Sequence, residues 1–267
     1  MENTLKKKVL ITGASSGIGF AIAELFAQND YDLILVARDI KKLSIAKKEL
    51  QKYNSDIRLI SKDLSVNGSA KEIFGIIKRN NIKIDILVND AGFGRYGFFN
   101  EISLDENINM INLNVLSLTE LTYLFLNEMI KNKSGKILNV ASTAAFQPGP
   151  LMSTYYATKA YVLSLSEAVQ RELQEKRKKG INVSLSTLCP GPTHTGFEKN
   201  AGLKNAKLFK NAMSSEDVAR LAYNGLMKNK PVIIPGFKNK FLYFMSKVAP
   251  RKERNNIVIN MNKGNVR

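Results

Sequence analysis

Short apolar runs alternate along this chain with longer stretches in which apolar residues recur at helical spacing. Seven runs are typical of buried strands, at residues 8–12, 32–37, 57–61, 84–88, 136–140, 181–188 and 231–234. Helical patterns separate these runs, with long ones at 105–131 and 154–178. The alternation predicts an α/β fold, a doubly wound parallel sheet of about seven strands with helices on both faces.

Individual residues mark where several elements begin and end. Asp39 is expected to cap the second helix, and Gly180 to close the helix that covers 154–178. The carboxyl ends of parallel strands gather at one edge of such a sheet, where ligands bind. The residues expected at that edge are Gly13, Asn89, Ser142 and Pro190.

A glycine-rich turn joins the first strand to the first helix, in the run T-G-A-S-S-G-I-G. Gly13, Gly17 and Gly19 do not follow the G-x-G-x-x-G spacing, but they serve the same physical purpose. Glycines let the backbone approach a pyrophosphate, and the helix that follows presents free N–H groups to it. The turn therefore predicts a Rossmann-type domain that binds a dinucleotide, with a plain strand-to-helix loop as the alternative.

A second constellation combines Ser142, Tyr155 and Lys159. If the segment is helical, positions 155 and 159 share a face, which brings the lysine ammonium beside the phenol. A neighbouring cation is expected to lower the pKa of Tyr155 into a range useful for proton transfer. The hydroxyl of Ser142 is suited to polarise a carbonyl oxygen.

Taken together, the glycine turn, Asn114, Ser142 and Tyr155-x-x-x-Lys159 resemble the short-chain dehydrogenase/reductase family, over about residues 5–235. Within it, the runs L-V-N-D-A-G-F-G, Y-Y-A-T-K-A-Y and C-P-G-P-T-H-T-G-F are similar to bacterial NADP-dependent reductases of broad or unassigned substrate range. The resemblance implies hydride transfer between NADP(H) and a carbonyl or alcohol substrate. Reduction of an apolar ketone or aldehyde is the expected direction.

The same resemblance implies a role for each catalytic residue. Ser142 and Tyr155 bind the carbonyl oxygen, and Tyr155 gives up its proton to it. Lys159 also holds the ribose hydroxyls of the nicotinamide. Asn114 holds a water that refills the proton chain, with Asn112 as the competing candidate.

Cofactor contacts also carry over from the family. Asp63 is expected to meet the adenine, unless it is a helix cap. Asp90 replaces an asparagine of the family pattern, and its carboxylate would bring an uncompensated charge to the end of the sheet. The expected cofactor-binding residues are Gly13, Ser15, Ser16, Gly17, Ile18, Gly19, Arg38, Asp63, Leu64, Asn89, Ala91, Gly92, Tyr155, Lys159, Pro190, Gly191, Thr193 and Thr195.

The end of the second strand favours NADP(H) as the cofactor. An NAD enzyme usually has a carboxylate there for the ribose 2′-hydroxyl. This chain has Ala37 at that position and Arg38 after it, whose planar guanidinium suits a 2′-phosphate. In the alternative, Arg38 is a solvated surface residue and Asp39 selects the cofactor.

Length and composition narrow the class of protein. A chain of 267 residues with 44% hydrophobic content suits one domain with an appendage. We expect a cytoplasmic enzyme, because no run approaches the length of a membrane span and the basic start leads directly into a strand. With Cys189 as the one cysteine and His194 as the one histidine, no metal site is expected, and His194 is expected to face solvent from its loop.

The basic charge is concentrated near the C-terminal end. Residues 199–267 carry 15 Lys and Arg against 3 acids, which is +12 of the total +17. We assign residues 1–236 to the catalytic and cofactor-binding domain, with a substrate loop at about 192–213, and 237–267 to a basic helix and tail. The helix is expected to lie on an anionic membrane or an acidic partner, or to cover the substrate cleft or a subunit interface.

Partners and substrate are less closely defined by the sequence. The segments 93–99, 143–152 and 196–209 flank the expected carbonyl site and are largely apolar, while Arg95 either binds an acidic substrate group or is solvated. A homodimer or homotetramer through the two long helices is expected from the resemblance, and nucleic-acid binding is not favoured. The alternatives are a non-catalytic NADP(H)-binding sensor or scaffold and a membrane-surface 3-oxoacyl or lipid reductase.

Overall fold

A computed structural model describes residues 6–203, 212–248, 250, 256, 258–260 and 262 of the chain. Within these residues the main strands are β1 (Lys8–Thr12), β2 (Asp32–Ala37), β3 (Ile57–Ser61), β4 (Ile86–Asn89), β5 (Ser134–Val140), β6 (Asn182–Leu188) and β9 (Val232–Ile233). They form one parallel sheet in the order β3-β2-β1-β4-β5-β6-β9. The order runs outward from β1 in both directions, so the predicted Rossmann-type, doubly wound α/β fold is confirmed.

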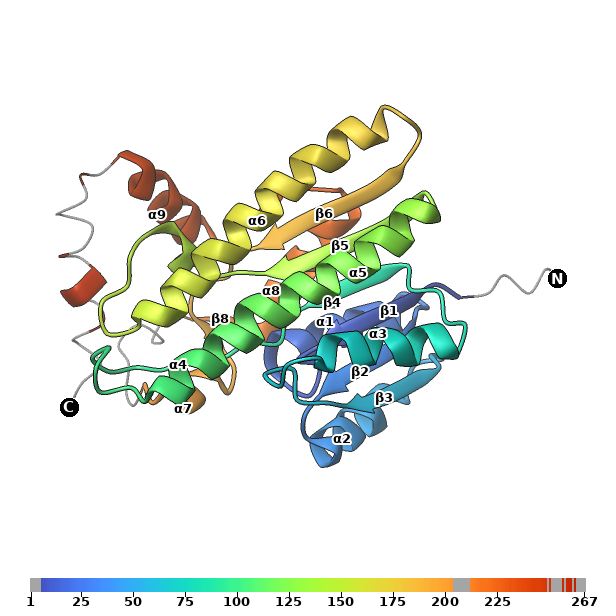
Figure 1. The fold of residues 1–267 in the computed structure, drawn as a ribbon, viewed down its shortest axis with the longest axis horizontal. Helices are drawn as coiled ribbons and strands as arrows, with labels where there is room; N and C mark the ends of the chain where they lie inside the picture. The colour runs from blue at the N-terminus through green and yellow to red at the C-terminus, as the bar shows by residue number, and fades with distance from the viewer. Residues whose placement is uncertain are drawn as a thin grey trace.

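Helices cover both faces of the sheet (Figure 1). One face packs against α1 (Gly17–Gln28), α2 (Ile40–Leu50) and α8 (Ser215–Met227). The other packs against α3 (Ser69–Arg79), α5 (Leu118–Lys131) and α6 (Ser153–Arg177). Along β1, Val9 and Ile11 enter the first core and Leu10 enters the second, because successive side chains of a strand point to opposite faces. The central strands are buried on both sides, which explains their unbroken apolar runs.

The long helix predicted at 105–131 is present but not uniform. It begins as α4 (Leu104–Ile111), widens into a π-helical segment η1 (Asn112–Ser117) and continues as α5. The hydroxyls of Ser117 and Thr119 donate to the carbonyls four residues earlier, at 2.8 and 2.7 Å. A π-helical segment changes which side chains face the core, and such segments are frequent at functional sites. Here Asn114 is buried.

The predicted helix boundaries at Asp39 and Gly180 are confirmed. The Asp39 side chain accepts hydrogen bonds from the backbone N–H groups of Lys41 and Lys42, at 3.0 and 3.1 Å, at the start of α2. Gly180 follows the end of α6 with φ +82°, a left-handed conformation that glycine adopts without strain.

The predicted substrate loop contains regular structure that the sequence pattern did not indicate. Strand β7 (Thr193–His194) pairs with β8 (Met213–Ser214), and the short helix α7 (Phe197–Ala201) lies between them in the chain. Residues 204–211 of the loop lie outside the described residues. The sequence pattern did not predict β7 and β8, because a strand of two residues is too short to show hydrophobic alternation.

The predicted basic helix is present as α9 (Phe237–Val248), at the outer edge of the molecule (Figure 1). Its Tyr243 ring packs on Phe146 of the short helix η2 (Thr143–Phe146), with ring centroids 4.5 Å apart. Part of the tail beyond α9 lies outside the described residues. Among the helices that are described, none has the length and apolar character needed to span a membrane.

Candidate active site

A cavity of about 590 Å³ lies at the carboxyl edge of the sheet. Loops from six strands and the first turns of α6 contribute to its wall. Of the residues predicted from the sequence, those lining it are Gly13, Ser15, Ser16, Gly17, Ile18, Arg38, Asp63, Leu64, Ala91, Gly92, Ser142, Tyr155, Lys159, Pro190, Gly191, Thr193 and Thr195. The structure therefore brings both predicted constellations, the glycine turn and the Ser-Tyr-Lys group, into one site.

The glycine turn leaves no room for side chains. Gly13 and Gly17 have φ of +72° and +58°. A Cβ on Gly13 would lie 2.9 Å from the Ala91 nitrogen, and one on Gly17 would lie 3.1 Å from Thr195. Ser16 precedes α1 in an extended conformation and makes no side-chain cap, so the first turn of α1 keeps backbone N–H groups for an anion. The residues present fit a dinucleotide pyrophosphate.

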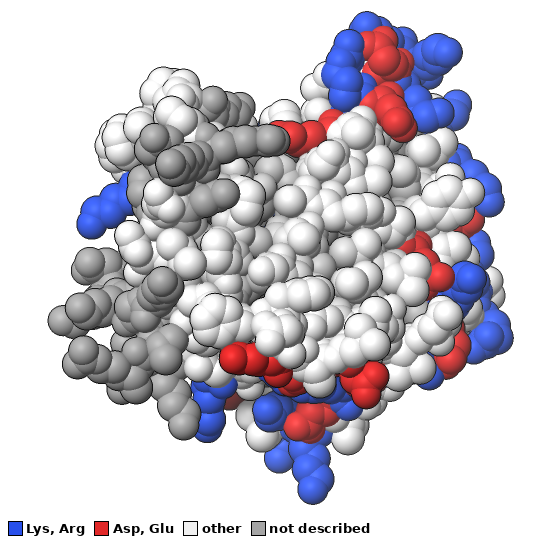
Figure 2. All heavy atoms as spheres, turned by 60° about the vertical axis from the view of Figure 1, so that its left-hand side comes forward, with Lys and Arg blue, Asp and Glu red and all other residues white. Residues whose placement is uncertain are grey.

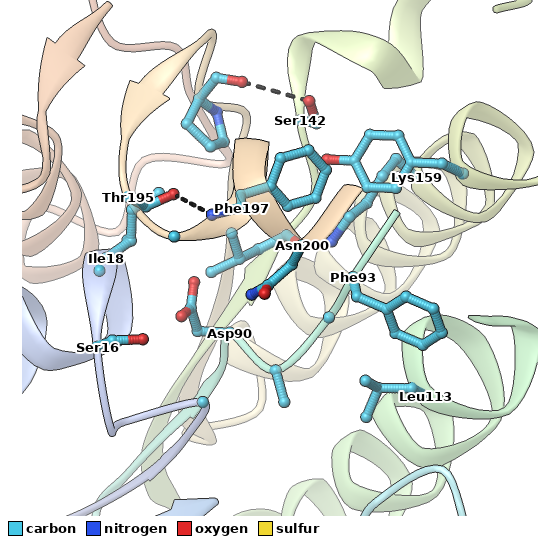
Figure 3. Close-up of a pocket in the computed structure, with 18 of the residues that line it drawn as sticks. Ser16, Ile18, Asp90, Phe93, Leu113, Ser142, Lys159, Thr195, Phe197 and Asn200 are labelled. Carbon is cyan, nitrogen blue, oxygen red and sulfur yellow. Dashed lines mark hydrogen bonds between the residues drawn. The ribbon is translucent and has the colours of Figure 1, made fainter. Parts of the chain in front are cut away.

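Ser142 and Tyr155 both line the cavity, and Figure 3 shows Ser142 near its upper end. Ser142 follows β5, and its hydroxyl accepts from the Ala144 N–H at 3.1 Å and points toward the Pro190 carbonyl at 3.4 Å. Tyr155 lies in the first turn of α6, and its phenol is close enough to the Ser142 hydroxyl for that hydroxyl to influence its pKa. The two hydroxyls are thus positioned to act on one substrate oxygen.

Lys159 lies one turn after Tyr155 on α6, as predicted, and is buried. Its amine donates to the Val140 carbonyl at the end of β5, at 2.9 Å, and lies 5.8 Å from the centroid of the Tyr155 ring. Burial lowers the pKa of Lys159 to about 8, and the nearby charge of Asp90 opposes that shift.

The expected lowering of the Tyr155 pKa is not found. Burial raises the pKa of Tyr155 above its usual value, and the Ser142 hydroxyl only partly opposes this. Desolvation is the main cause of the raised pKa, and the amine of Lys159 donates to the Val140 carbonyl. The phenol is therefore protonated at neutral pH and is suited to donate a proton.

Three predicted residues do not line the cavity: Gly19, Asn89 and Asn114. The Asn89 amide turns into the sheet and donates to Thr122 and Asn139, at 3.1 and 2.9 Å, so its side chain is not available to a cofactor. Gly19 packs against the Gly13 carbonyl.

Asn114 holds the loop after β4 from behind. Its amide accepts from the Phe93 N–H at 3.1 Å and donates to the Phe93 carbonyl and the Thr158 hydroxyl, at 2.9 and 3.1 Å. Its oxygen also lies 3.0 Å from where a Cβ on Gly92 would be, next to the Lys159 amine. Of the two candidates, Asn112 and Asn114, it is therefore Asn114 that faces inward. Its part in proton transfer stays a prediction.

Arg38 and Asp63 lie at the end of the cavity remote from Tyr155. Arg38 is exposed, and its side chain forms no ion pair with any residue that the structure describes. The Asp63 carboxylate accepts from the Ser65 N–H and hydroxyl, at 2.9 and 2.7 Å. Since α3 begins only at Ser69, Asp63 does not cap that helix.

Asp90, which departs from the family pattern, also lines the cavity. Its carboxylate accepts a hydrogen bond from the Gly19 N–H. Burial raises the pKa of Asp90 to about 7, opposed by the charge of Lys159 and by that hydrogen bond. The expected charge at the end of the sheet is thus partly compensated.

The substrate side of the cavity is aromatic and was predicted only as apolar segments. The Phe197 ring of α7 packs on Tyr155 with centroids 5.2 Å apart, and Met152 lies in the same cluster. Beside this cluster, the side-chain amide of Asn262 donates to the Pro150 carbonyl at 2.8 Å, and its backbone carbonyl accepts from the Tyr96 hydroxyl at 3.1 Å. No motif marks Asn262, since its partners are more than a hundred residues away in the chain.

The Arg95 side chain lines the cavity and is partly exposed, and its guanidinium already has partners within the protein. Its guanidinium pairs with Glu106 of α4 at 2.6 Å and also donates to the Asn200 carbonyl of α7. It stacks over the Phe93 ring, 5.2 Å from the centroid. Arg95 therefore bridges the two sides of the substrate opening.

Groups that might suggest other chemistry do not gather here. Within the described residues, no three His, Cys, Asp or Glu side chains are placed to hold a metal ion. Cys189 is buried, which raises the pKa of its thiol to about 12. His194 is exposed on β7, as predicted, and does not line the cavity.

Comparison with known proteins agrees with this geometry. Residues 7–206 match the profile of the short chain dehydrogenase family. The uncharacterized oxidoreductase YvrD of Bacillus subtilis is 36% identical over 197 residues, which are 73% of this chain and 72% of YvrD. The 3-oxoacyl-(acyl-carrier-protein) reductase FabG of Chlamydia pneumoniae is 30% identical over 223 residues, 81% of this chain and 88% of that protein.

Two solved structures of similar proteins contain different cofactors. A short-chain dehydrogenase from Sphingobium yanoikuyae in complex with NADPH has a TM-score of 0.79 and 29% identity, covering 98% of this chain and 96% of that one. A short-chain dehydrogenase/reductase from Burkholderia phymatum in complex with NAD has a TM-score of 0.77 and 25% identity, covering 88% of this chain and 90% of that one. These similarities support a nicotinamide cofactor without choosing between its two forms.

Proposed function

The chain belongs to the short-chain dehydrogenase/reductase family, and we propose that it is an NADPH-dependent reductase of apolar ketones or aldehydes. The observation that carries the proposal is that Ser142, Tyr155 and Lys159 share one cavity with the glycine turn. When bound there, the cofactor supplies a hydride.

Proton transfer falls to Tyr155. Its phenol and the Ser142 hydroxyl together donate to the carbonyl oxygen of the substrate, which stabilises the negative charge that develops on it. Because burial raises the pKa of Tyr155, the phenol carries its proton at neutral pH and delivers it to that oxygen. Lys159, behind the phenol, stabilises the phenolate left after the transfer and supplies an ammonium to the ribose hydroxyls.

Preference for NADP(H) is supported by the remote end of the cavity. The Arg38 guanidinium forms no ion pair with any of the described residues. Arg38 follows Ala37 in the chain, and Ser15 lines the same cavity. An arginine there binds a 2′-phosphate, whereas no carboxylate at position 37 is present for a 2′-hydroxyl. The Asp39 alternative is disfavoured because its carboxylate is committed to the α2 amides.

An apolar substrate is supported by the aromatic wall. Phe93, Met152 and Phe197 line the cavity on the Tyr155 side. The nearby cation, Arg95, is neutralised by Glu106, so a carboxylate or phosphate on the substrate finds no free partner there. Among the expected classes, aldehydes and uncharged ketones fit this wall best.

A second candidate, a reductase of lipid-bound carbonyls at a membrane surface, is favoured by α9. Four large apolar side chains one turn apart are exposed on one stripe of this helix: Phe237 at 84%, Phe241 at 56%, Phe244 at 60% and Val248 at 60%. Lys238 and Lys240 flank the stripe and α9 contains no acid. Anionic lipid attracts the lysines of this surface and accepts its phenylalanines.

Self-association is supported on another surface. Figure 2 shows a broad face free of charged side chains and bordered by them. The helices α4, α5 and α6 have exposed apolar and aromatic side chains: Leu104 and Ile108 on α4, Tyr123 on α5 and Tyr161 on α6. The predicted homodimer or homotetramer would cover such residues.

Sedimentation velocity at two protein concentrations measures the oligomeric state. A monomer at both concentrations overturns the prediction of a homodimer or homotetramer.

The cytoplasmic location also stays a prediction.

Replacing Tyr155 with Phe tests the mechanism. The variant lacks the proton donor, so we expect the rate of NADPH oxidation with a reducible aldehyde or ketone to fall by roughly 10²–10⁴-fold, while NADPH still binds. Tyr161→Phe, on the same helix, is the control and should keep its activity. Wild-type protein that binds NADPH but reduces none of a broad carbonyl panel would instead support the sensor or scaffold alternative.

Replacing Arg38 with Leu tests cofactor choice. Loss of a charge-assisted hydrogen bond of about 1.5–3 kcal/mol should weaken NADPH binding by roughly 10–100-fold and leave NADH binding unchanged. Titration of intrinsic cofactor fluorescence measures both dissociation constants. Arg58→Leu, an exposed arginine on β3, serves as control. An equal loss for both cofactors would contradict a 2′-phosphate site at Arg38.

Sedimentation with vesicles tests the α9 surface. We expect binding to phosphatidylserine-containing vesicles at low salt, release at high salt, and little binding to phosphatidylcholine alone. The double variant Phe241→Ser and Phe244→Ser should bind more weakly, and Phe99→Ser, which alters an exposed phenylalanine elsewhere, should not. No binding of the wild-type protein at low salt would remove the membrane candidate.

A further inference from the structure

Asp90 occupies an unusual place between the cofactor turn and the catalytic group. Its backbone N–H donates to the Thr12 hydroxyl at 3.1 Å, which fixes the residue to the end of β1. Its side chain points into the cavity beside Ile18 and Thr195 (Figure 3). There the carboxylate accepts the N–H of Gly19, in the first turn of α1.

That N–H belongs to the group of backbone donors that an anion needs. The free N–H groups of the first turn and the helix dipole make the start of α1 attractive to a pyrophosphate. Asp90 uses one of these donors and brings a negative charge of its own. The first turn of α1 carries no charged side chain, and the titratable groups facing Asp90 are Lys159 and Tyr155 of α6. Among the described residues, Lys159 is the cation whose charge acts on Asp90.

The oxygen atoms around Gly19 show how the conflict is relieved. A Cβ on Gly19 would lie 2.7 Å from the Asp90 Oδ2 and 2.6 Å from the Gly13 carbonyl oxygen. The Asp90 carboxyl therefore lies directly against Gly19, in the first turn of α1. A proton on the carboxyl removes its negative charge at this turn and adds a donor, which an ionised carboxylate cannot provide. Burial already favours this neutral form.

We propose that Asp90 is a positioning residue that takes up a proton when the anionic cofactor binds. The proposal rests on the proposed function, since it requires a pyrophosphate at the start of α1. In its protonated form, Asp90 has the shape and charge of the asparagine that the family pattern places there. In its ionised form, it repels the cofactor and competes for the Gly19 N–H.

The sign of the pH dependence follows from this linkage. The phosphates favour the neutral carboxyl, so the bound state holds a proton that the free state loses above pH about 7. Cofactor affinity is then constant at low pH and falls by up to about tenfold per pH unit above neutrality. Lys159, with a pKa of about 8, loses its charge in the upper part of the same range and weakens binding in the same direction.

Asp90→Asn separates these contributions. NADPH dissociation constants are measured for the wild-type protein and the variant from pH 5.5 to 8.5, and their ratio cancels the titration of the cofactor itself. We expect a ratio near one at pH 5.5 that rises at least tenfold by pH 8.5, with the wild-type protein binding more weakly. A ratio that does not change with pH, or weaker binding by the variant throughout, overturns the proposal. If neither protein binds NADPH or NADH at any pH, the proposed function fails and this inference with it.

A readout without cofactor accompanies the titration. A carboxyl whose pKa is raised on folding loses stability as pH rises from its unfolded value, near 4, to about 7. The midpoint of urea unfolding of the wild-type protein should therefore fall relative to Asp90→Asn over that range. Parallel curves for the two proteins would show that Asp90 is already ionised in the free state and would overturn the proposal. Asp63→Asn is the control, because that carboxylate lies in the cavity but away from α1.

Discussion

The hydrogen bond from the buried Lys159 amine to the Val140 carbonyl is the contact on which the rest of the site depends. It joins α6 to the end of β5, with Tyr155 one turn before the lysine and Ser142 two residues after the valine. One contact therefore sets the distance between the two hydroxyls that act on the substrate. The same amine compensates the charge of Asp90, so the proton donor and the cofactor turn share a single cation.

The two ends of the cavity are built in different ways. At the cofactor end, backbone atoms approach each other closely, as Gly13 does with Ala91, and there is little freedom to exchange side chains. At the substrate end, side chains from distant segments meet: Phe197 lies on Tyr155, and Arg95 bridges to Glu106. A family can keep the first end and vary the second, which is why the comparisons identify the chemistry more readily than the substrate.

The features that the sequence predicts, and those that it does not, follow the same division between the two ends of the cavity. The strands, the glycine turn and the Ser-Tyr-Lys group could be predicted, because local periodicity and spacing specify them. The direction of the Asn89 side chain could not be predicted, because spacing does not tell which way an amide turns at the end of a strand, and the hydrogen bonds with Thr122 and Asn139 decide it. The π-helical segment, β7 and β8 lack a hydrophobic period of their own. The pKa of Tyr155 depends on burial, which a motif does not contain.

The contacts of Asn262 have a consequence for how the protein is made. Its partners, Pro150 and Tyr96, lie 112 and 166 residues earlier in the chain. Contacts of such long separation form late in folding, because they close the largest loops. On the ribosome, all the strands of the main sheet, through β9, are synthesised before residue 262. The segment that contains Asn262 is therefore added to Tyr96 and Pro150 only after the sheet is complete in the chain.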